Sequence, residues 1–228
     1  EKAIADGCDQ VLILNNDIEF DNNLIERLIA IQEYKDCSLV APKIMYYDNP
    51  SYIWYAGRRF IKTKGYLPLH NGLKQKDIAQ YNKIRYVEYA PTCCLLIKRK
   101  VFEDIGFMDE KYFVYFDDTD FSYRIWKDQR HKIIYLPTVK ILHKVGSLTK
   151  SFNEEENKIF RGDFFLKQNI KNHIYFLRKI RTPFAFLFIF CLFFKNNLRI
   201  LINPQLRKNY STFKLVNKAY FHGLLMKL

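Results

Sequence analysis

The sequence has few cysteines, and none lies in a pattern that binds metal or builds a disulfide framework. There are five, with no CxxC pair and no histidine at zinc-ligand spacing. This excludes a disulfide-stabilised secreted domain and a structural zinc site, and it favours a reducing cytosol. Residues 1–7 also lack the basic and then apolar character of a signal peptide. No internal repeat or low-complexity tract is present.

Positive charge is in large excess. The 228 residues carry a formal net charge of +13, and 49% of them are hydrophobic. This hydrophobic content allows a globular core, and the charge favours anionic partners: phosphate groups, nucleic acid or an acidic lipid surface. Charge alone does not choose among these partners.

Short apolar runs separated by polar loops predict an α/β domain over residues 1–150. Uninterrupted apolar runs are typical of strands buried in a parallel sheet, so we expect a mixed, mainly parallel sheet flanked by helices. Between Tyr46 and Arg85 the sequence loses its periodicity, which predicts a long surface loop. The predicted strands are Gln10–Leu14, Ser38–Met45, Tyr86–Ile97, Ile133–Leu136 and Val139–Leu142.

The loop after the first predicted strand contains Asn15 and Asp17. Ligands of open α/β sheets bind at the carboxyl ends of strands, and Mg²⁺ or Mn²⁺ prefers carboxylate and amide oxygens. Such a cation neutralises the charge that develops on a diphosphate leaving group. An ordinary helix-capping turn is the alternative interpretation of the same residues.

Three carboxylates, those of Asp117, Asp118 and Asp120, lie within four residues. Their mutual repulsion raises at least one pKa, which suits a general base. If a helix begins near Asp118, then Asp120 can pair with Arg124 four residues later, and the other two carboxylates are free to face a cleft. The alternative is that the acidic residues only stabilise a helix N-terminus.

His143 follows an apolar run and comes shortly before Gly146. A neutral imidazole can ligate a divalent metal, and a glycine lets the backbone approach a phosphate. A histidine at a strand end is also commonly structural.

Taken in order, these segments resemble the family 2 glycosyltransferases, particularly the bacterial rhamnosyltransferase-like branch that builds surface polysaccharides. Residues 5–17 look like that family's helix, strand and DxD-type loop. Residues 106–124 are similar to its stretch before and through the acidic ED motif, and residues 143–147 match its late H-x-x-G-S element.

The resemblance implies a GT-A fold, a nucleotide-sugar donor such as dTDP-rhamnose or a UDP-sugar, and inversion at the anomeric carbon. Asp17, Asn15 and His143 would then bind the divalent metal and the donor diphosphate, and Thr92 would lie where small residues line the donor site. Asp118 would be the base, with Asp117 and Asp120 shaping its pocket. The acceptor would be the hydroxyl of a cell-surface polysaccharide precursor.

Residues 151–228 form a basic, aromatic tail with helical spacing. Its apolar segment 183–194 is shorter than the ~20 residues that span a bilayer, so an interfacial anchor is expected. Lys and Arg can hold lipid phosphates, which predicts a lipid-linked acceptor, an anionic membrane surface as partner and a location at the cytoplasmic face of the cell membrane. A helical hairpin packed on the domain is the alternative.

The chain departs from the family pattern in four ways. Asn15 replaces the first Asp of DxD, Asp117 stands where the family usually has Glu, and residues 91–94 lie where small residues, often Gly, normally line the donor site. The largest departure is that nothing precedes Glu1 where the family has its nucleotide-binding strands. We therefore expect a truncated catalytic domain that binds donor poorly by itself. Two other classes stay open: an inactive fragment with a structural role, and a basic nucleic-acid-binding module. The second leaves the acidic cluster without a purpose, since carboxylates repel phosphates, so no nucleic-acid partner is expected.

Overall fold

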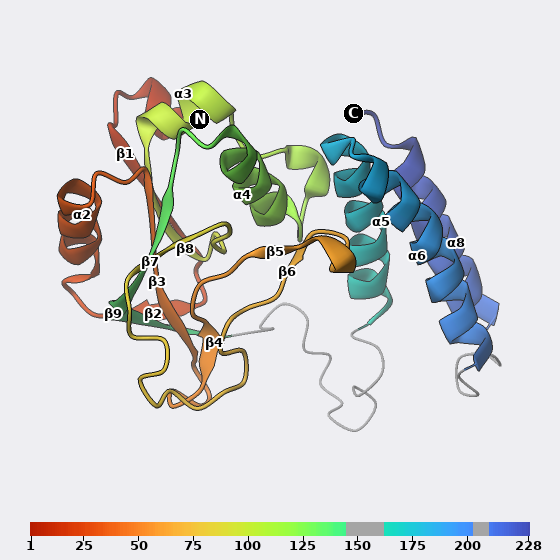
Figure 1. Cartoon of the computed structure of the whole chain (residues 1–228), viewed down its shortest axis with the longest axis horizontal. Coiled ribbons are helices and arrows are strands. Elements are labelled where there is room, and N and C mark those ends of the chain that lie inside the picture. Colours follow the sequence, from red (N-terminus) through yellow and green to blue (C-terminus); the bar gives the residue numbers. More distant parts are fainter. Residues whose placement is uncertain (145–161, 203–209) are drawn as a thin grey trace. The chain divides into compact units, whose positions relative to one another are not determined.

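The computed structural model describes residues 1–144, 162–202 and 210–228 (Figure 1). The chain forms two compact units. The first comprises Glu1–Ile61, Leu67–Glu110 and the chain from Asp117 to the end of the last strand. The second contains the C-terminal helices and two short segments, Lys62–Tyr66 and Lys111–Phe116, that interrupt the first unit in sequence. The predicted boundary at residue 150 lies outside the described residues.

The first unit is built on a seven-stranded sheet of mixed direction. Its order is β1-β8-β3-β9-β2, with β4 paired to β3 and β7 paired to β9, and β5 and β6 form a separate pair. The strands are β1 (Gln10–Leu14), β2 (Ile18–Phe20), β3 (Leu39–Tyr46), β4 (Ile53–Tyr55), β5 (Phe60–Ile61), β6 (Leu67–Pro68), β7 (Arg85–Val87), β8 (Cys94–Lys98) and β9 (Ile133–His143).

The mixed α/β architecture is as predicted, but the expected mainly parallel direction is wrong. Only β3 and β9 pair in parallel among the described strands, and the other pairings of this sheet are antiparallel. An apolar run shows that a strand is covered on both faces, and this can happen in either direction. Strand β3, for example, is buried over seven of its eight residues and has an antiparallel partner in β8 as well as its parallel one.

Two predicted strand boundaries are also wrong. Glu88–Cys93 separates β7 from β8, so the predicted run over Tyr86–Ile97 is two strands. Conversely, β9 continues through Pro137, where two strands were expected. Proline is tolerated because the register against β3 shifts between Pro42 and Lys43, which leaves a local gap in the ladder.

Helices lie on both sides of this sheet. They are α1 (Lys2–Ala5), α2 (Leu24–Tyr34), α3 (Arg99–Ile105) and α4 (Asp117–Asp128), and Figure 1 shows α2 and α4 on opposite sides of the strands. Leu24, Leu28 and Gln32 recur every four residues and form the buried face of α2. On the other side, Phe121 and Ile125 of α4 are buried in the same core.

A buried lysine fixes the long aperiodic loop to the sheet. Lys43 on β3 is fully buried, and its Nζ donates to Asp77 Oδ1 at 3.1 Å and to Asn82 Oδ1 at 2.6 Å. Lys140 on β9 donates to the same Asp77 carboxylate at 2.9 Å. Because an unpaired charge is costly to bury, this network holds the loop in one conformation. The segment expected to be an irregular surface loop is therefore anchored to the sheet near its C-terminal end.

The second unit is a helical bundle of α5 (Asp163–Ile180), α6 (Pro183–Ile202) and α8 (Tyr210–Leu225). It also contains the 3-10 turn η1 (Lys62–Lys64). The 3-10 turn η2 (Glu110–Tyr112) spans the boundary between the two units in the sequence. Gly223 lets α8 approach α5 closely, since a Cβ there would lie 2.4 Å from the Lys171 carbonyl oxygen. Arg178 of α5 donates to the carbonyls of Gly223 and Met226 and so satisfies the end of α8.

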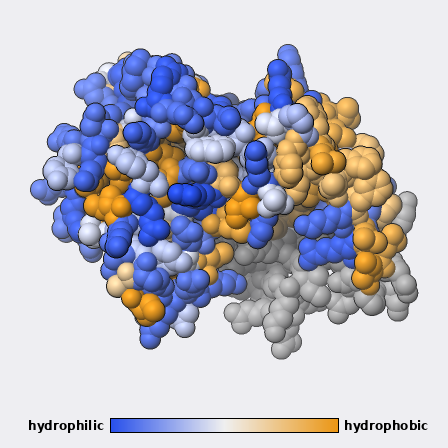
Figure 2. Space-filling view, in the orientation of Figure 1, coloured by the Kyte–Doolittle hydropathy of each residue, from blue (hydrophilic) through white to orange (hydrophobic). Residues whose placement is uncertain are grey.

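Helix α6 is longer than the apolar segment predicted at 183–194. It has 20 residues, and by length and composition it could cross a membrane; 17% of its apolar window is buried within the structure. The helix continues beyond 194 because Lys195, Asn196 and Asn197 are compatible with helical backbone even though they end the apolar run. Figure 2 shows apolar surface gathered over α6 and α8.

Candidate functional site

The loop after β1 brings Asp17 and His143 together at one end of the sheet. The Asn15 N–H donates to the Cys93 carbonyl at 3.0 Å, and the chain then turns into β2, whose first residue pairs with His143. The Lys144 N–H donates to the Asp17 carbonyl at 2.9 Å. As a result, His143 Nε2 lies 3.4 Å from Asp17 Oδ1. Asn15, the other predicted metal ligand, has an exposed side chain on the same loop.

His143 is held in an apolar setting. It is 9% exposed, and its ring lies edge-on to the Trp54 ring at a centroid distance of 4.8 Å. Burial lowers the pKa of His143, although the Asp17 carboxylate opposes that change. The imidazole is therefore neutral at physiological pH, which is the form that ligates metals.

Asp118 is the most perturbed carboxylate of the acidic cluster. It lies at the start of α4, where its Oδ2 accepts a hydrogen bond from the Tyr89 hydroxyl at 2.5 Å and its Oδ1 accepts one from Thr119 at 3.2 Å. Burial raises the pKa of Asp118 to about 7; the adjacent Asp117 adds to the rise and the two hydrogen bonds oppose it. Burial also raises the pKa of Asp117. Asp118 thus exchanges a proton near neutral pH.

Asp120 is placed differently. Its carboxylate is 2% exposed and pairs with Arg124 Nε at 3.0 Å, as the four-residue spacing predicts. Arg124 also donates to the Ile105 and Phe107 carbonyls. These contacts tie α4 to the end of α3. The placement favours a bracing role for Asp120, and its predicted role in shaping the base pocket stays a prediction.

Cys93 lies close to both Asp17 and Asp118. It lies in the turn before β8, next to the half-buried Thr92. Burial raises the pKa of the Cys93 thiol strongly, and the charges of Cys94, Asp118 and Asp17 add to it. The carboxylates of Asp17 and Asp118 therefore both lie near the Cys93 thiol. The structure brings Asp17, His143, Thr92 and Asp118 to one region, while their chemical roles stay predictions. The residues 145–147 of the predicted H-x-x-G-S element lie outside the described residues.

The sequence analysis missed four residues that lie near these groups: Trp54, Arg58, His70 and Tyr89. His70 Nδ1 lies 2.7 Å from the Trp54 carbonyl oxygen, and its ring contacts those of Trp54 and Tyr89 edge-on or tilted. The Arg58 guanidinium lies 5.5 Å from the centre of the Tyr89 ring. Three of the four come from the aperiodic stretch 46–85. Their only sequence signal was an aromatic and glycine-rich composition, with Gly57 at φ +81° marking a required turn.

The residues present can hold part of a divalent metal's coordination sphere. Among the described residues, no group of three or more His, Cys, Asp or Glu side chains is close enough to enclose an ion. Asp17 and His143 supply one carboxylate and one imidazole. Mg²⁺ commonly takes one or two protein ligands and completes its sphere with water and substrate phosphates, so this pair fits such an ion.

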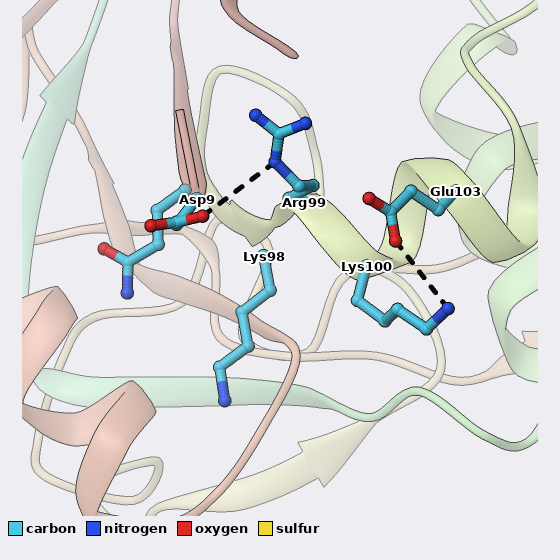
Figure 3. A pocket seen from close by; sticks show the side chains of 6 residues that line it. Asp9, Lys98, Arg99, Lys100 and Glu103 are labelled. Atoms are coloured by element: carbon cyan, nitrogen blue, oxygen red, sulfur yellow. Dashed lines mark ion pairs between the residues drawn. The ribbon is translucent and has the colours of Figure 1, made fainter. Parts of the chain in front are cut away.

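A separate shallow pocket of about 300 Å³ lies at the opposite end of β1 (Figure 3). It contains the ion pairs Arg99–Asp9 at 3.9 Å and Lys100–Glu103 at 3.6 Å. Its lining includes Gln10, the first residue of β1, whereas Asn15 follows the last. The pocket is thus distinct from the candidate site.

Comparison with known proteins finds glycosyltransferases. No family model matches the sequence. The chain is 28% identical over 116 residues to the low-salt glycan biosynthesis hexosyltransferase Agl10 of Haloferax volcanii, covering 51% of this chain and 36% of that protein. It is 36% identical over 59 residues to the N-acetylglucosaminyl-diphospho-decaprenol L-rhamnosyltransferase of Mycobacterium tuberculosis, covering 26% and 19%.

The fold has a solved counterpart. The crystal structure of GalNAc-T7 with UDP, GalNAc and Mn²⁺ superposes with a TM-score of 0.50 at 15% identity, over 75% of this chain and 31% of that one. At this identity the likeness shows the fold alone. The chain spans about a third of the first relative's length and about a fifth of the second's.

Proposed function

We propose that this GT-A-fold chain, a relative of glycan-building hexosyl- and rhamnosyltransferases, carries the catalytic base of an inverting family 2 glycosyltransferase. The observation that carries the proposal is the convergence of Asp118 and the Asp17–His143 pair near Cys93. A base that titrates near neutral pH next to a candidate cation site matches the needs of sugar transfer from a nucleotide donor.

Asp118 acts on the acceptor. In the proposed step its ionised carboxylate accepts the proton of the attacking hydroxyl as the new bond to the anomeric carbon forms. The bond from that carbon to the donor diphosphate breaks at the same time, and the leaving group departs with the electron pair. A pKa of about 7 gives Asp118 both a substantial ionised fraction and adequate basicity at neutral pH. A single displacement inverts the anomeric carbon.

Asp17 and His143 are the proposed ligands of a divalent metal, with Asn15 beside them on the same loop. A bound Mg²⁺ or Mn²⁺ would neutralise charge on the donor diphosphate. The β2–β9 pairing supports this proposal, because Ile18, the residue after Asp17, pairs with His143 at the end of β9. The structural counterpart was crystallised with UDP and Mn²⁺, which supports a nucleotide-sugar donor and a metal.

The proposed acceptor is a lipid-linked glycan at the cytoplasmic face of a membrane. The name of the mycobacterial relative gives it a lipid-diphosphate-linked sugar as acceptor. In this chain, α6 exposes the apolar side chains of Phe184, Phe186, Leu187, Phe190 and Phe194. Exposed aromatic residues on a helix flanked by Arg and Lys suit insertion among lipids with anionic headgroups.

The test is transfer of radiolabelled sugar to lipid-linked acceptor in vesicles, assayed with a panel of nucleotide sugars. Asp118→Asn should lower kcat by roughly 10²- to 10⁴-fold, the usual contribution of a general base. Asp128→Asn, at the other end of the same helix and paired with Arg130, is the matched control and should keep full activity. Undiminished transfer by Asp118→Asn would refute the proposal.

A further inference from the structure

Arg58 is a buried cation near Asp118, and no carboxylate among the described residues is hydrogen-bonded to it. The Arg58 side chain is 4% exposed, and its Nε is fully buried without a hydrogen-bond acceptor. Within the described part of the chain, no carboxylate, carbonyl or hydroxyl oxygen accepts a hydrogen bond from its guanidinium. Buried arginines are normally paired, because an unpaired buried charge is costly.

The nearby carboxylate of Asp118 accepts hydrogen bonds from other residues. Asp118 accepts from the Tyr89 hydroxyl through Oδ2 and from Thr119 through Oδ1. Arg58 lies instead over the face of the Tyr89 ring, 5.5 Å from its centre. One tyrosine therefore contacts the carboxyl group through its hydroxyl and the guanidinium through its ring.

Arg58 remains charged in this position. Burial lowers the pKa of Arg58 to about 9, and the neighbouring Tyr89, Tyr55 and Asp118 oppose that change. Its neighbour His70 adds no charge, since burial, together with the charge of Arg58, lowers the pKa of His70 to about 3. At neutral pH the Arg58 guanidinium is thus positively charged, without a hydrogen-bonded counter-ion in the part of the chain that the structure describes.

Other arginines in this chain have a structural role, because their hydrogen bonds join separate elements. Arg124 donates to Asp120 and to two carbonyls, and Arg178 donates to two carbonyls at the end of α8. Each joins separate elements through several hydrogen bonds. The Arg58 guanidinium makes no such bonds to the described residues, so hydrogen bonding between elements does not explain its burial.

We propose that Arg58 binds a phosphate group of the substrate beside Asp118. The planar guanidinium matches two phosphate oxygens at once, and a fixed cation stabilises the charge that develops on a departing diphosphate. The proposal rests on the proposed function. The phosphate could belong to the nucleotide-sugar donor or to a lipid-linked acceptor, and the experiment below separates these sources.

Calorimetric titration with inorganic pyrophosphate at low ionic strength is the first measurement. Arg58→Gln should bind pyrophosphate roughly 10- to 100-fold more weakly than the unaltered chain, the loss expected for charge-assisted hydrogen bonds. Arg59→Gln is the matched control, because Arg59 is adjacent and exposed. Equal affinity in both variants, or no binding by the unaltered chain, would overturn the proposal.

Thermal unfolding distinguishes ligand binding from bracing. Removing an unpaired buried charge should leave the Tm of Arg58→Gln unchanged or raised. A lowered Tm together with lost binding would assign a structural role instead and would overturn the proposal.

Titrations with UDP, dTDP and geranyl diphosphate then identify the source. If Arg58→Gln weakens only the nucleotides, the phosphate is the donor's; if it weakens only geranyl diphosphate, it is the acceptor's. The Asp118→Asn result reports on the proposed function independently. If pyrophosphate binding depends on Arg58 while Asp118→Asn keeps full transfer, the phosphate site is supported and Asp118 is refuted as the base.

Discussion

Tyr89→Phe tests whether Asp118 is the base whose protonation limits the reaction. The substitution removes one hydroxyl and leaves the ring beneath Arg58 in place. The lost hydrogen bond, 2.5 Å long, stabilises the ionised form of Asp118, so its removal raises the pKa of Asp118 further above about 7. A hydrogen bond to a charged group contributes about 1.5–3 kcal/mol, and one pKa unit corresponds to about 1.4 kcal/mol. The expected rise is about 1–2 units.

The consequence is a shifted pH profile for sugar transfer. A base must be deprotonated to act, so kcat/KM rises with pH through the pKa of Asp118. In the unaltered chain this rise is centred near pH 7, and in Tyr89→Phe it should be centred at about pH 8–9. At pH 7 the variant should be about 5- to 50-fold less active, and it should recover as the pH approaches 10.

The assay is transfer to lipid-linked acceptor measured from pH 5 to 10. Tyr86→Phe is the matched control, because Tyr86 is exposed on β7 and makes no contact with Asp118 in the structure. Its profile should coincide with that of the unaltered chain. A Tyr89→Phe profile that is lowered equally at every pH, with its midpoint unchanged, would refute the assignment of the rise in kcat/KM to the deprotonation of Asp118.

Three further predictions concern stability and membrane binding. Asp77→Ala leaves the buried Lys43 without its carboxylate partner, and should lower the free energy of unfolding by about 3–5 kcal/mol in urea denaturation; a change below 1 kcal/mol would contradict the network. Asn172 is fully buried and donates to the carbonyls of Tyr112, Val114 and Tyr115, so Asn172→Ala should cost about 1–3 kcal/mol and increase amide exchange in residues 112–116; unchanged exchange would refute this. Phe186 and Phe190 are exposed, so Phe186→Ser with Phe190→Ser should weaken binding to anionic vesicles by about 10-fold or more without a change in Tm. Equal binding would refute α6 as the membrane anchor.

The helical unit holds an unusual backbone just before the acidic cluster. Phe113, Tyr115 and Phe116 all have positive φ, which is strained for non-glycine residues. Asn172 donates its amide to the same short segment, and the His173 ring stacks on Phe116. Residue 116 is followed directly by Asp117 and Asp118. Contacts from α5 therefore hold residues 114–116 in this strained backbone.

Local features of the sequence predicted several properties of the candidate site residues. Asp17 follows an apolar run that is a strand, and the spacing of Asp120 and Arg124 fixes their ion pair, because both features depend on neighbours in sequence. The density of carboxylates at residues 117–120 likewise indicated a raised pKa, and the adjacent Asp117 does add to the rise at Asp118, whose first cause is burial. The strand, the ion pair and the charge of Asp117 follow from spacing along the chain, whereas the burial of Asp118 depends on how the elements pack.

Only the tertiary structure decided the strand directions and the residues that surround Asp118. Apolar periodicity records which faces are covered and carries no information on direction, so the antiparallel partners of β3 and β1 could not be predicted. Arg58 and His70 lie in an aperiodic stretch that is bonded to the sheet by the buried Lys43–Asp77 pair. Their proximity to Asp118 and His143 arises from contacts between segments far apart in sequence, and no local pattern encodes it.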